Sequence, residues 1–317
     1  MASRSLAPYV LAVLTRPPMT NGVKTVVMRD RLAAFSSSVC RLAFVALVCA
    51  PAMVPQMLHA QRGTIPRQAN GKPDLNGIWR ANGNDSYDIE PHNARAAMAS
   101  RPGPVVPVPA REVLAFGAVG SVPSGRGIVV GGPIPYTAEA LAKKRENQEN
   151  WLTRDPEIKC YLPGVPRANY MPYSFQIIQS TKAFFMAYEY AGATRRVYFK
   201  DPGPAETDSW MGQSVGAWQG DTFVVTVTGM NADTWFDRAG NHHTEAMKVV
   251  ERYTMLGPDH MRYEATMEDP QTFTRPWTIR TTLYRNVEPD ATLGQFKCVE
   301  FVEELLYGHL RKAPIKP

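Results

Sequence analysis

The sequence lacks any apolar run long enough to cross a membrane as a helix. Its longest run covers residues 42–54, about 13 residues, whereas a spanning helix needs roughly 20. This shortage excludes a polytopic membrane protein. Charged residues make up 20% of the chain beside 44% hydrophobic residues, which excludes wholesale disorder. The 317 residues suffice for two average domains or one large β-domain.

Several motifs that identify enzymes are also missing. The sequence contains no phosphate-binding loop, no dinucleotide fingerprint, no Cys-Xaa-Xaa-Cys pair and no zinc-protease helix. These absences remove well-known enzyme classes but leave acid–base catalysis open. We therefore expect no cofactor and no resident metal ion.

Net basicity is confined to one end of the sequence. The formal charge is +6, yet residues 1–60 hold six basic residues and one acid, and the remainder holds 29 basic and 28 acidic residues. A nearly neutral remainder gives no electrostatic reason to bind nucleic acid. We expect no nucleic-acid partner.

Residues 1–60 have the three parts of a secretory signal. A basic stretch around Arg31 precedes the apolar run 42–54, and a short polar exit ends at Ala60. We expect cleavage after Ala60, a periplasmic or secreted product, and no stable membrane insertion once the leader is removed. An uncleaved N-terminal anchor and lipid attachment at Cys49 are the alternatives.

Cysteine is scarce, and two of the four cysteines, Cys40 and Cys49, belong to the leader. The exported part keeps only Cys160 and Cys298, an even number suited to an oxidising compartment. We therefore predict a disulfide between them, with two buried thiols as the alternative.

The rest of the chain divides by composition. Residues 61–97 are predicted to form an N-terminal segment with one short strand, and residues 98–135 a loop too rich in Pro and Gly for helix or sheet. Thr137 can cap a helix that runs to about residue 152. This helix and the β-rich part that follows occupy residues 136–317 and form one domain with the N-terminal segment.

From residue 175 onward, apolar and polar residues alternate in stretches separated by tight glycine turns, a pattern typical of antiparallel strands. Such strands close or stack to remove their edges. We predict a mainly β fold, an antiparallel meander closing into a barrel of calycin or lipocalin type with an interior cavity, one helix and the long Pro/Gly-rich loop. The predicted strands are residues 175–179, 184–190, 196–200, 214–218, 222–228, 247–256, 260–268 and 277–284.

Strand alternation puts one carboxylate on an apolar face. Glu251 shares its face with Met247, Val249, Tyr253 and Met255. A carboxylate buried there needs a partner, so we predict an Arg, a Tyr hydroxyl or His243 within hydrogen-bonding distance. Glu251 is then either a site residue or half of a structural ion pair, whereas Glu264 on the next strand is predicted to point outward.

The densest polar cluster lies between two predicted strands, in residues 231–245. A loop histidine near acids is what acid–base chemistry requires, so we predict that His243 acts as acid or base. Asp237 or Glu245 would orient its ring, and Glu251 would add a second carboxylate. The alternative is structural, with Asp237 closing a turn and His243 bonding the backbone. Adjacent histidines point to opposite sides of an extended chain, which argues against a shared metal ion.

A second cluster follows the first exported cysteine in a proline-stiffened stretch. Arg167, Tyr170 and Tyr173 are predicted to bind a ligand, because an arginine and two tyrosines can clamp a carboxylate or stack on a sugar or aromatic ring. Trp235 in the loop cluster and Tyr253 are further candidate ligand contacts. The alternative is a packed crossover tied to the barrel by the disulfide.

Seven different short motifs are spread over the chain after the leader. They are Asp74-Leu75-Asn76-Gly77-Ile78-Trp79, Cys160-Tyr161-Leu162-Pro163-Gly164-Val165-Pro166-Arg167, residues 214–222, residues 231–237, His243-Thr244-Glu245-Ala246, Val250-Glu251-Arg252 and residues 263–270. Together they resemble a family of exported, functionally uncharacterised β-rich proteins common in soil bacteria. Relatives usually carry Pro where this sequence has His242, which marks His243 as the family position. The resemblance implies export and a shared fold, and it implies no activity.

Two functions follow from these patterns. We predict an exported β-barrel protein that binds a small molecule, either apolar, aromatic or a sugar. The alternative is an exported hydrolase or lyase that uses His243 and Glu251. Convergence of these two side chains in one pocket would favour the enzyme.

Overall fold

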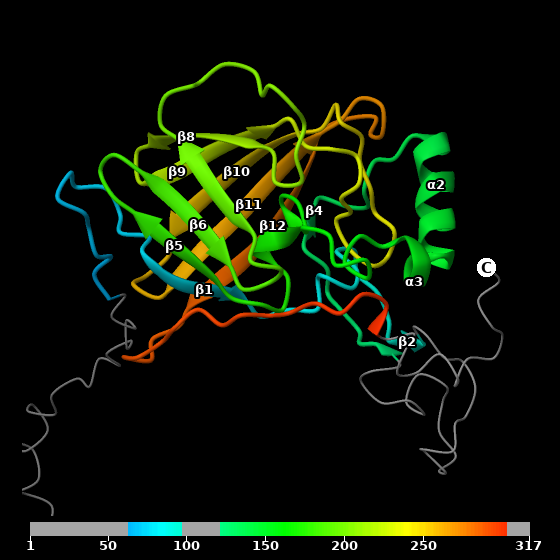
Figure 1. Ribbon diagram of the computed structural model, residues 1–317, viewed down its shortest axis with the longest axis horizontal. Coiled ribbons are helices and arrows are strands. Elements are labelled where there is room, and N and C mark those ends of the chain that lie inside the picture. The colour runs from blue at the N-terminus through cyan, green and yellow to red at the C-terminus, as the bar shows by residue number, and fades with distance from the viewer. Residues whose placement is uncertain (1–62, 97–120, 303–317) are drawn as a thin grey trace, which may run out of the picture. The chain divides into compact units, whose positions relative to one another are not determined.

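A computed structural model describes residues 63–96 and 121–302 (Figure 1). The predicted signal, its cleavage site at Ala60 and most of the predicted Pro/Gly-rich loop lie outside the described residues.

The described chain forms a closed β-barrel of nine strands, which confirms the predicted fold (Figure 1). Each strand pairs with the next, and the last pairs with the first, so the sheet has no free edge along this circuit. In barrel order the strands are β1 (Gly77–Ala81), β5 (Phe175–Gln179), β6 (Phe184–Tyr188), β7 (Thr194–Tyr198), β8 (Gln213–Gln219), β9 (Thr222–Thr228), β10 (Lys248–Met255), β11 (His260–Glu268) and β12 (Trp277–Arg285).

One junction departs from the predicted antiparallel meander. β7 and β8 pair in parallel, through Val197 with Ser214 and Tyr198 with Val215, whereas the other barrel pairings are antiparallel. A parallel pair cannot be joined by a tight turn. Residues 199–212 therefore cross back along the outside of the barrel, and we call them the crossover segment.

The segment predicted to lack regular structure contains short strands in its described part. β4 (Val129–Val130) pairs with β12, and β3 (Ser121–Val122) pairs with β2 (Arg95–Ala96). The prediction of a loop over residues 98–135 is therefore wrong for these four residues, because backbone pairing with an existing strand needs little local propensity.

The predicted helix begins as expected. Thr137 caps α2 (Ala138–Glu149) by accepting a hydrogen bond from the Ala140 amide at 3.2 Å. The helix ends three residues early, and a single turn, α3 (Trp151–Arg154), follows it. Among the described residues, no helix combines the length and the apolar character that a bilayer span requires.

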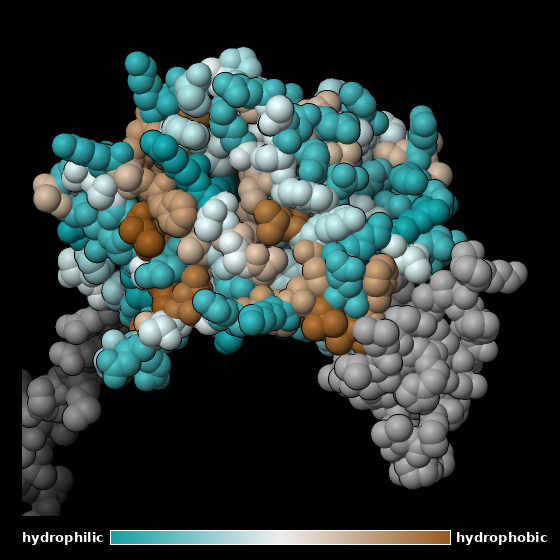
Figure 2. Space-filling model, in the orientation of Figure 1, coloured by the Kyte–Doolittle hydropathy of each residue, from teal (hydrophilic) through white to brown (hydrophobic). Residues whose placement is uncertain are grey.

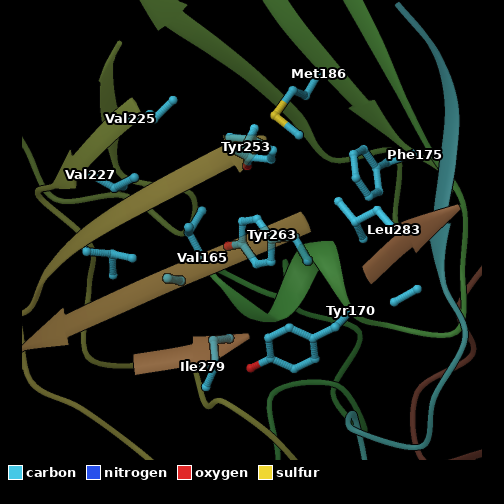
Figure 3. Packing of buried hydrophobic residues seen from close by; sticks show 14 of the residues in the cluster. Val165, Tyr170, Phe175, Met186, Val225, Val227, Tyr253, Tyr263, Ile279 and Leu283 are labelled. Atoms are coloured by element: carbon cyan, nitrogen blue, oxygen red, sulfur yellow. The ribbon is translucent and has the colours of Figure 1, made fainter. Parts of the chain in front are cut away.

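The interior of the barrel is filled with side chains. Alternate residues of the strands point inward, and several of the largest fully buried side chains are aromatic: Trp79, Phe175, Phe184, Phe223, Tyr253 and Tyr263. Figure 3 shows Tyr253 and Tyr263 on neighbouring strands, with Val165 beside Tyr263 and Tyr170 below both, and all four belong to the hydrophobic core. The space that we predicted as a ligand cavity is a packed core.

Residues 155–173, which we call the plug segment, pack into the core of the barrel, where Val165, Ala168 and Tyr170 are buried. They contain a short 3₁₀ helix, η1 (Arg167–Asn169), all of whose residues are buried. The Tyr170 hydroxyl donates to the Phe236 carbonyl at 2.8 Å, which joins the plug segment to the loop between β9 and β10. A Cβ added at Gly164 would lie 2.7 Å from the Thr234 hydroxyl, so this close approach requires glycine.

The predicted disulfide is confirmed. Cys160 and Cys298 are bonded, with Cα atoms 5.6 Å apart, and they close a loop of 138 residues. The bond fastens the chain that follows β12, orange to red in Figure 1, to the plug segment.

Candidate functional site

A buried ion pair between Arg195 on β7 and Glu251 on β10 lies in the interior of the barrel. Their side chains are 1% and 0% exposed. Arg195 Nη1 lies 3.1 Å from Glu251 Oε1, and a second contact joins Nη2 to Oε2. The predictions that Glu251 is buried and that an arginine or tyrosine pairs with it are confirmed.

Three further donors converge on the same carboxylate oxygen. Glu251 Oε1 accepts hydrogen bonds from Tyr263 at 2.7 Å, Tyr253 at 2.9 Å and the Asn169 amide at 2.9 Å. Asn169 belongs to the plug segment, so the carboxylate joins the plug to the barrel wall. We call these five residues the interior cluster.

The hydroxyl groups of Tyr188 and Ser214 extend the interior cluster to seven residues. The Tyr188 hydroxyl donates to Asn169 Oδ1 at 3.0 Å, and Arg195 Nε donates to Ser214 Oγ at 2.7 Å. Residues 212–216 read Gly-Xaa-Ser-Xaa-Gly, the spacing of a serine nucleophile elbow. Ser214 instead lies within β8, where an elbow would require a sharp turn from strand to helix, so this motif match has no catalytic context.

The charges of the interior cluster compensate each other. Burial alone would lower the pKa of Arg195, but the Glu251 carboxylate raises it well above its usual value. Burial, and then the charge of Glu251, raise the pKa values of Tyr253 and Tyr263 well above their usual range. Both hydroxyls therefore stay protonated and donate. The arrangement fits a structural ion pair better than a site awaiting a substrate.

His243 lies in the loop between β9 and β10, and both of its ring nitrogens are engaged. Nε2 is 2.6 Å from the Thr234 hydroxyl, and Nδ1 is 2.9 Å from the Thr244 carbonyl. A carbonyl can only accept, so Nδ1 carries the proton and Nε2 accepts from Thr234. Burial lowers the pKa of His243 to about 4, which keeps the ring neutral. This is the structural alternative considered from the sequence.

The acids predicted to orient His243 bond elsewhere. Asp237 is fully buried, and its two oxygens accept from the amides of Ile89, Ala239 and Asn241 and from the Asn241 side chain. Burial, reinforced by Asp88, raises the pKa of Asp237 to about 7. Glu245 is exposed. The described contacts thus do not bring His243 together with Asp237 or Glu245. The catalytic role of these residues stays a prediction.

The predicted ligand-binding residues of the plug segment are mostly engaged in the fold. Arg167 lies between Asp155 and Glu157, at 2.8 and 2.6 Å. Burial alone would raise the pKa of Glu157, but Arg238 and Arg167 lower it to about 2. Tyr170 bonds the loop, as described above. A packed crossover, the structural alternative, therefore fits both residues.

Trp235 and Tyr253 are likewise buried. Trp235 is 8% exposed and forms an isolated backbone bridge with His242. Tyr253 belongs to the interior cluster. Among the described residues, no group of three His, Cys, Asp or Glu side chains is arranged to hold a metal ion.

Tyr173 differs from the other predicted ligand contacts because its ring packs on Phe296, a residue that lines an open groove. Its ring packs on Tyr190 and on Phe296, with ring centres 5.4 and 4.4 Å apart. Phe296 lines a groove of about 700 Å³ on the outside of the barrel. We call it the disulfide groove, because both bonded cysteines line it. Its other lining residues are 187–189, 191–194, 293–295 and 297.

The disulfide groove lies between small residues of a turn and residues 293–298. The turn between β6 and β7 contains Ala191, Gly192 and Ala193, which leave space that larger side chains would fill. Opposite this turn, the Phe296 amide donates to the Glu189 carbonyl at 3.1 Å. The disulfide holds the same segment two residues later. Apart from Tyr173 and the cysteine pair, no feature of the sequence indicated this groove.

No family model matches the chain, and neither a curated protein nor a solved structure matches it. The resemblance to an exported soil-bacterial family accordingly stays a prediction. Function is inferred below from the geometry of the described residues.

Proposed function

We propose that this protein is an exported β-barrel protein that binds a small molecule in the disulfide groove. The observation that carries the proposal is the groove itself. Its volume of about 700 Å³ falls within the range of roughly 300–1,000 Å³ that ligand pockets occupy. The barrel interior, by contrast, is filled by large buried side chains.

The lining of the disulfide groove favours an apolar or aromatic ligand that carries a polar group. Alanines, Leu293, the Phe296 ring and the disulfide supply an apolar surface. Lys297 and Glu189 supply one charge of each sign. A mostly apolar lining with a few polar groups is typical of sites that bind and orient small molecules.

Two observations support export. Residues 1–60 have the composition of a secretory signal, and the disulfide is of the kind that persists in oxidising compartments. The test is to express the full chain in a bacterium, separate the compartments and determine the N-terminus of the exported form. We expect it to begin at Gln61. A full-length chain confined to the cytoplasm would contradict export.

Ligand binding can be tested with N-phenyl-1-naphthylamine, an apolar aromatic probe whose fluorescence rises on burial. We expect saturable binding with one probe per chain. Ala187→Trp places a large side chain in the groove and should weaken binding at least about tenfold, or roughly 1.4 kcal/mol. Ala217→Trp is the matched control, because Ala217 is exposed on β8 and does not line the groove.

Two outcomes would contradict the proposed site. One is the same loss of probe affinity in both tryptophan variants. The other is a wild-type protein that does not bind the probe and from which mass spectrometry detects no small molecule carried through purification.

The alternative function, a hydrolase or lyase using His243, receives no support from the described contacts. A general base needs a ring nitrogen that can reach substrate. Both nitrogens of His243 bond protein groups, and its ring is 3% exposed. Glu251 contacts the residues of the interior cluster and not His243.

A further inference from the structure

The parallel junction of the barrel creates a second pocket, separate from the disulfide groove except for the shared rim residue Thr194. β7 and β8 are joined by two register pairs, and the crossover segment runs over the outer face of β7. Between them lies a pocket of about 520 Å³, which we call the crossover pocket. Its lining comes from β7, from residues 202–212 of the crossover segment and from the start of β8.

The walls of the crossover pocket are held in place by specific contacts. Gln213 Nε2 donates to the Gly203 carbonyl at 2.6 Å, and the Gly203 amide donates to Asp201 Oδ1 at 2.9 Å. Further along, the Ser209 amide donates to the Gly229 carbonyl at 2.9 Å. Pro202 and Pro204 restrict the backbone between these anchors. The pocket is therefore preformed, which lowers the entropy cost of binding.

Its chemistry differs from that of the disulfide groove. Hydroxyl groups come from Thr194, Thr207 and Ser209, and charged groups come from Arg196 and Glu206. The pocket thus offers hydrogen-bond donors and acceptors on several sides and more polar than apolar surface. An apolar ligand would leave these groups unpaired. A purely anionic ligand would meet the Glu206 carboxylate.

Arg196 and Tyr198 form the floor on the outer face of β7. The Arg196 guanidinium carbon lies 4.7 Å from the centre of the Tyr198 ring. Arg196 is exposed, whereas its neighbour Arg195 points inward to Glu251, as strand alternation requires. No salt bridge of the described residues includes Arg196. Its guanidinium is available to donate to a ligand from a fixed position over the ring.

We propose that the crossover pocket binds a saccharide. A sugar ring presents hydroxyl groups that both donate and accept, which matches the hydroxyl, guanidinium and carboxylate groups of the lining. A monosaccharide fits within about 520 Å³. This site is distinct from the disulfide groove, so the protein would carry an apolar ligand and a sugar at separate places.

The test measures sugar binding by saturation-transfer NMR with D-glucose, D-galactose, D-mannose and D-glucuronate. We expect at least one of the four to bind saturably, with a dissociation constant on the order of 1 mM. Arg196→Met should weaken that binding at least about tenfold. Arg252→Met is the matched control, because Arg252 is a polar residue of the outer face of β10 that bonds Gln219 and does not line the pocket. Both variants should melt at the wild-type temperature.

The proposal is overturned if none of the four sugars binds at concentrations up to about 50 mM. It is also overturned if Arg196→Met binds sugar as the wild type does, or if Arg252→Met loses the same affinity. Competition separates this site from the proposed function. N-phenyl-1-naphthylamine should not displace the sugar, and Ala187→Trp should leave sugar binding intact.

Discussion

The interior cluster and the loop around His243 are both buried and polar, yet they are built from different contacts. The interior cluster joins β7, β10, β11 and the plug segment through one carboxylate. In the loop, His243 bonds Thr234 and Thr244, residues close to it in the sequence. The interior cluster thus connects residues that are far apart in the sequence, whereas the loop is held by contacts between residues that are close in the sequence.

This difference shows why residue type alone misleads about function. Glu251 has the charge and burial expected of a catalytic acid, but its partners satisfy it from four elements. His243 has the chemistry of a proton carrier, but burial keeps it neutral. The open spaces lie elsewhere, on the outside of the barrel. On the face shown in Figure 2, hydrophobic residues form separate patches among hydrophilic ones.

The largest expected effect comes from breaking the interior ion pair. Glu251→Gln leaves Arg195 buried without a counter-charge and should lower the free energy of unfolding by about 3–5 kcal/mol. Urea unfolding followed by circular dichroism measures this. Glu264→Gln is the control, because Glu264 forms a partly exposed pair with Arg280 and should cost less than about 1 kcal/mol. Unchanged stability with lost ligand binding would instead make Glu251 a site residue.

Removing the disulfide tests whether the polar contacts of the plug segment persist without the covalent bond. Replacing Cys160 and Cys298 together by Ala should lower the free energy of unfolding by about 2–5 kcal/mol. The interior cluster should persist, because none of its hydrogen bonds involves either cysteine. Near-ultraviolet circular dichroism, which reports packed tyrosines, should keep its native form. A collapse of that signal in the folded variant would show that the bond organises the interior.

The loop between β9 and β10 should make the free energy of unfolding depend on pH. His243 has a pKa near 4 in the fold and about 6.5 when unfolded. Between these values the unfolded chain binds more protons, so stability falls as the pH drops through this window. From pH 7 to 4.5 the loss from His243 should be roughly 2–3 kcal/mol. Asp237, whose pKa is raised to about 7, acts in the opposite direction.

A variant that lacks the histidine isolates the contribution of His243 to this pH dependence. His243→Gln should remove the contribution of His243, so the stability difference between wild type and variant shrinks as the pH falls from 7 to 4.5. His260→Gln, at an exposed position of β11, should leave the pH dependence as in the wild type. A His243→Gln profile parallel to the wild type would mean that the pKa of His243 is the same in the folded and the unfolded chain, which would contradict the lowered pKa.

The smallest effect is expected from a single hydroxyl of the interior cluster. Tyr188→Phe removes the donor to Asn169 and should cost about 1 kcal/mol. Tyr284→Phe, on the partly exposed face of β12, should be within about 0.5 kcal/mol of the wild type. A cost above that of Glu251→Gln would reverse the proposed ranking within the interior cluster.

Much of the barrel could be predicted because strand alternation and glycine turns are local signals. The strands 175–179, 222–228 and 260–268 begin and end where the sequence placed them. The parallel pairing of β7 with β8 could not be predicted, because it depends on where the crossover segment returns. The strand predicted over 196–200 lies two residues earlier, over Thr194–Tyr198.

That shift explains which site residues were missed. With the strand placed at 196–200, Arg195 fell in a turn, and the partner of Glu251 could be specified only by type. Alternation from the buried Val197 would have turned Arg195 inward. Asn169 reaches Glu251 only because the plug segment enters the barrel, a tertiary contact without a local signal. The disulfide groove likewise needs segments more than a hundred residues apart.

The central claim is that the interior is a sealed structural core and that the ligand binds outside it. The most direct measurement is the NMR footprint of N-phenyl-1-naphthylamine on aromatic and methyl signals. The account predicts shifts at Phe296 and Leu293, which line the disulfide groove, and unchanged signals for Tyr253 and Tyr263. Shifts at Tyr253 and Tyr263, with Phe296 unmoved, would place the ligand inside the barrel and contradict it.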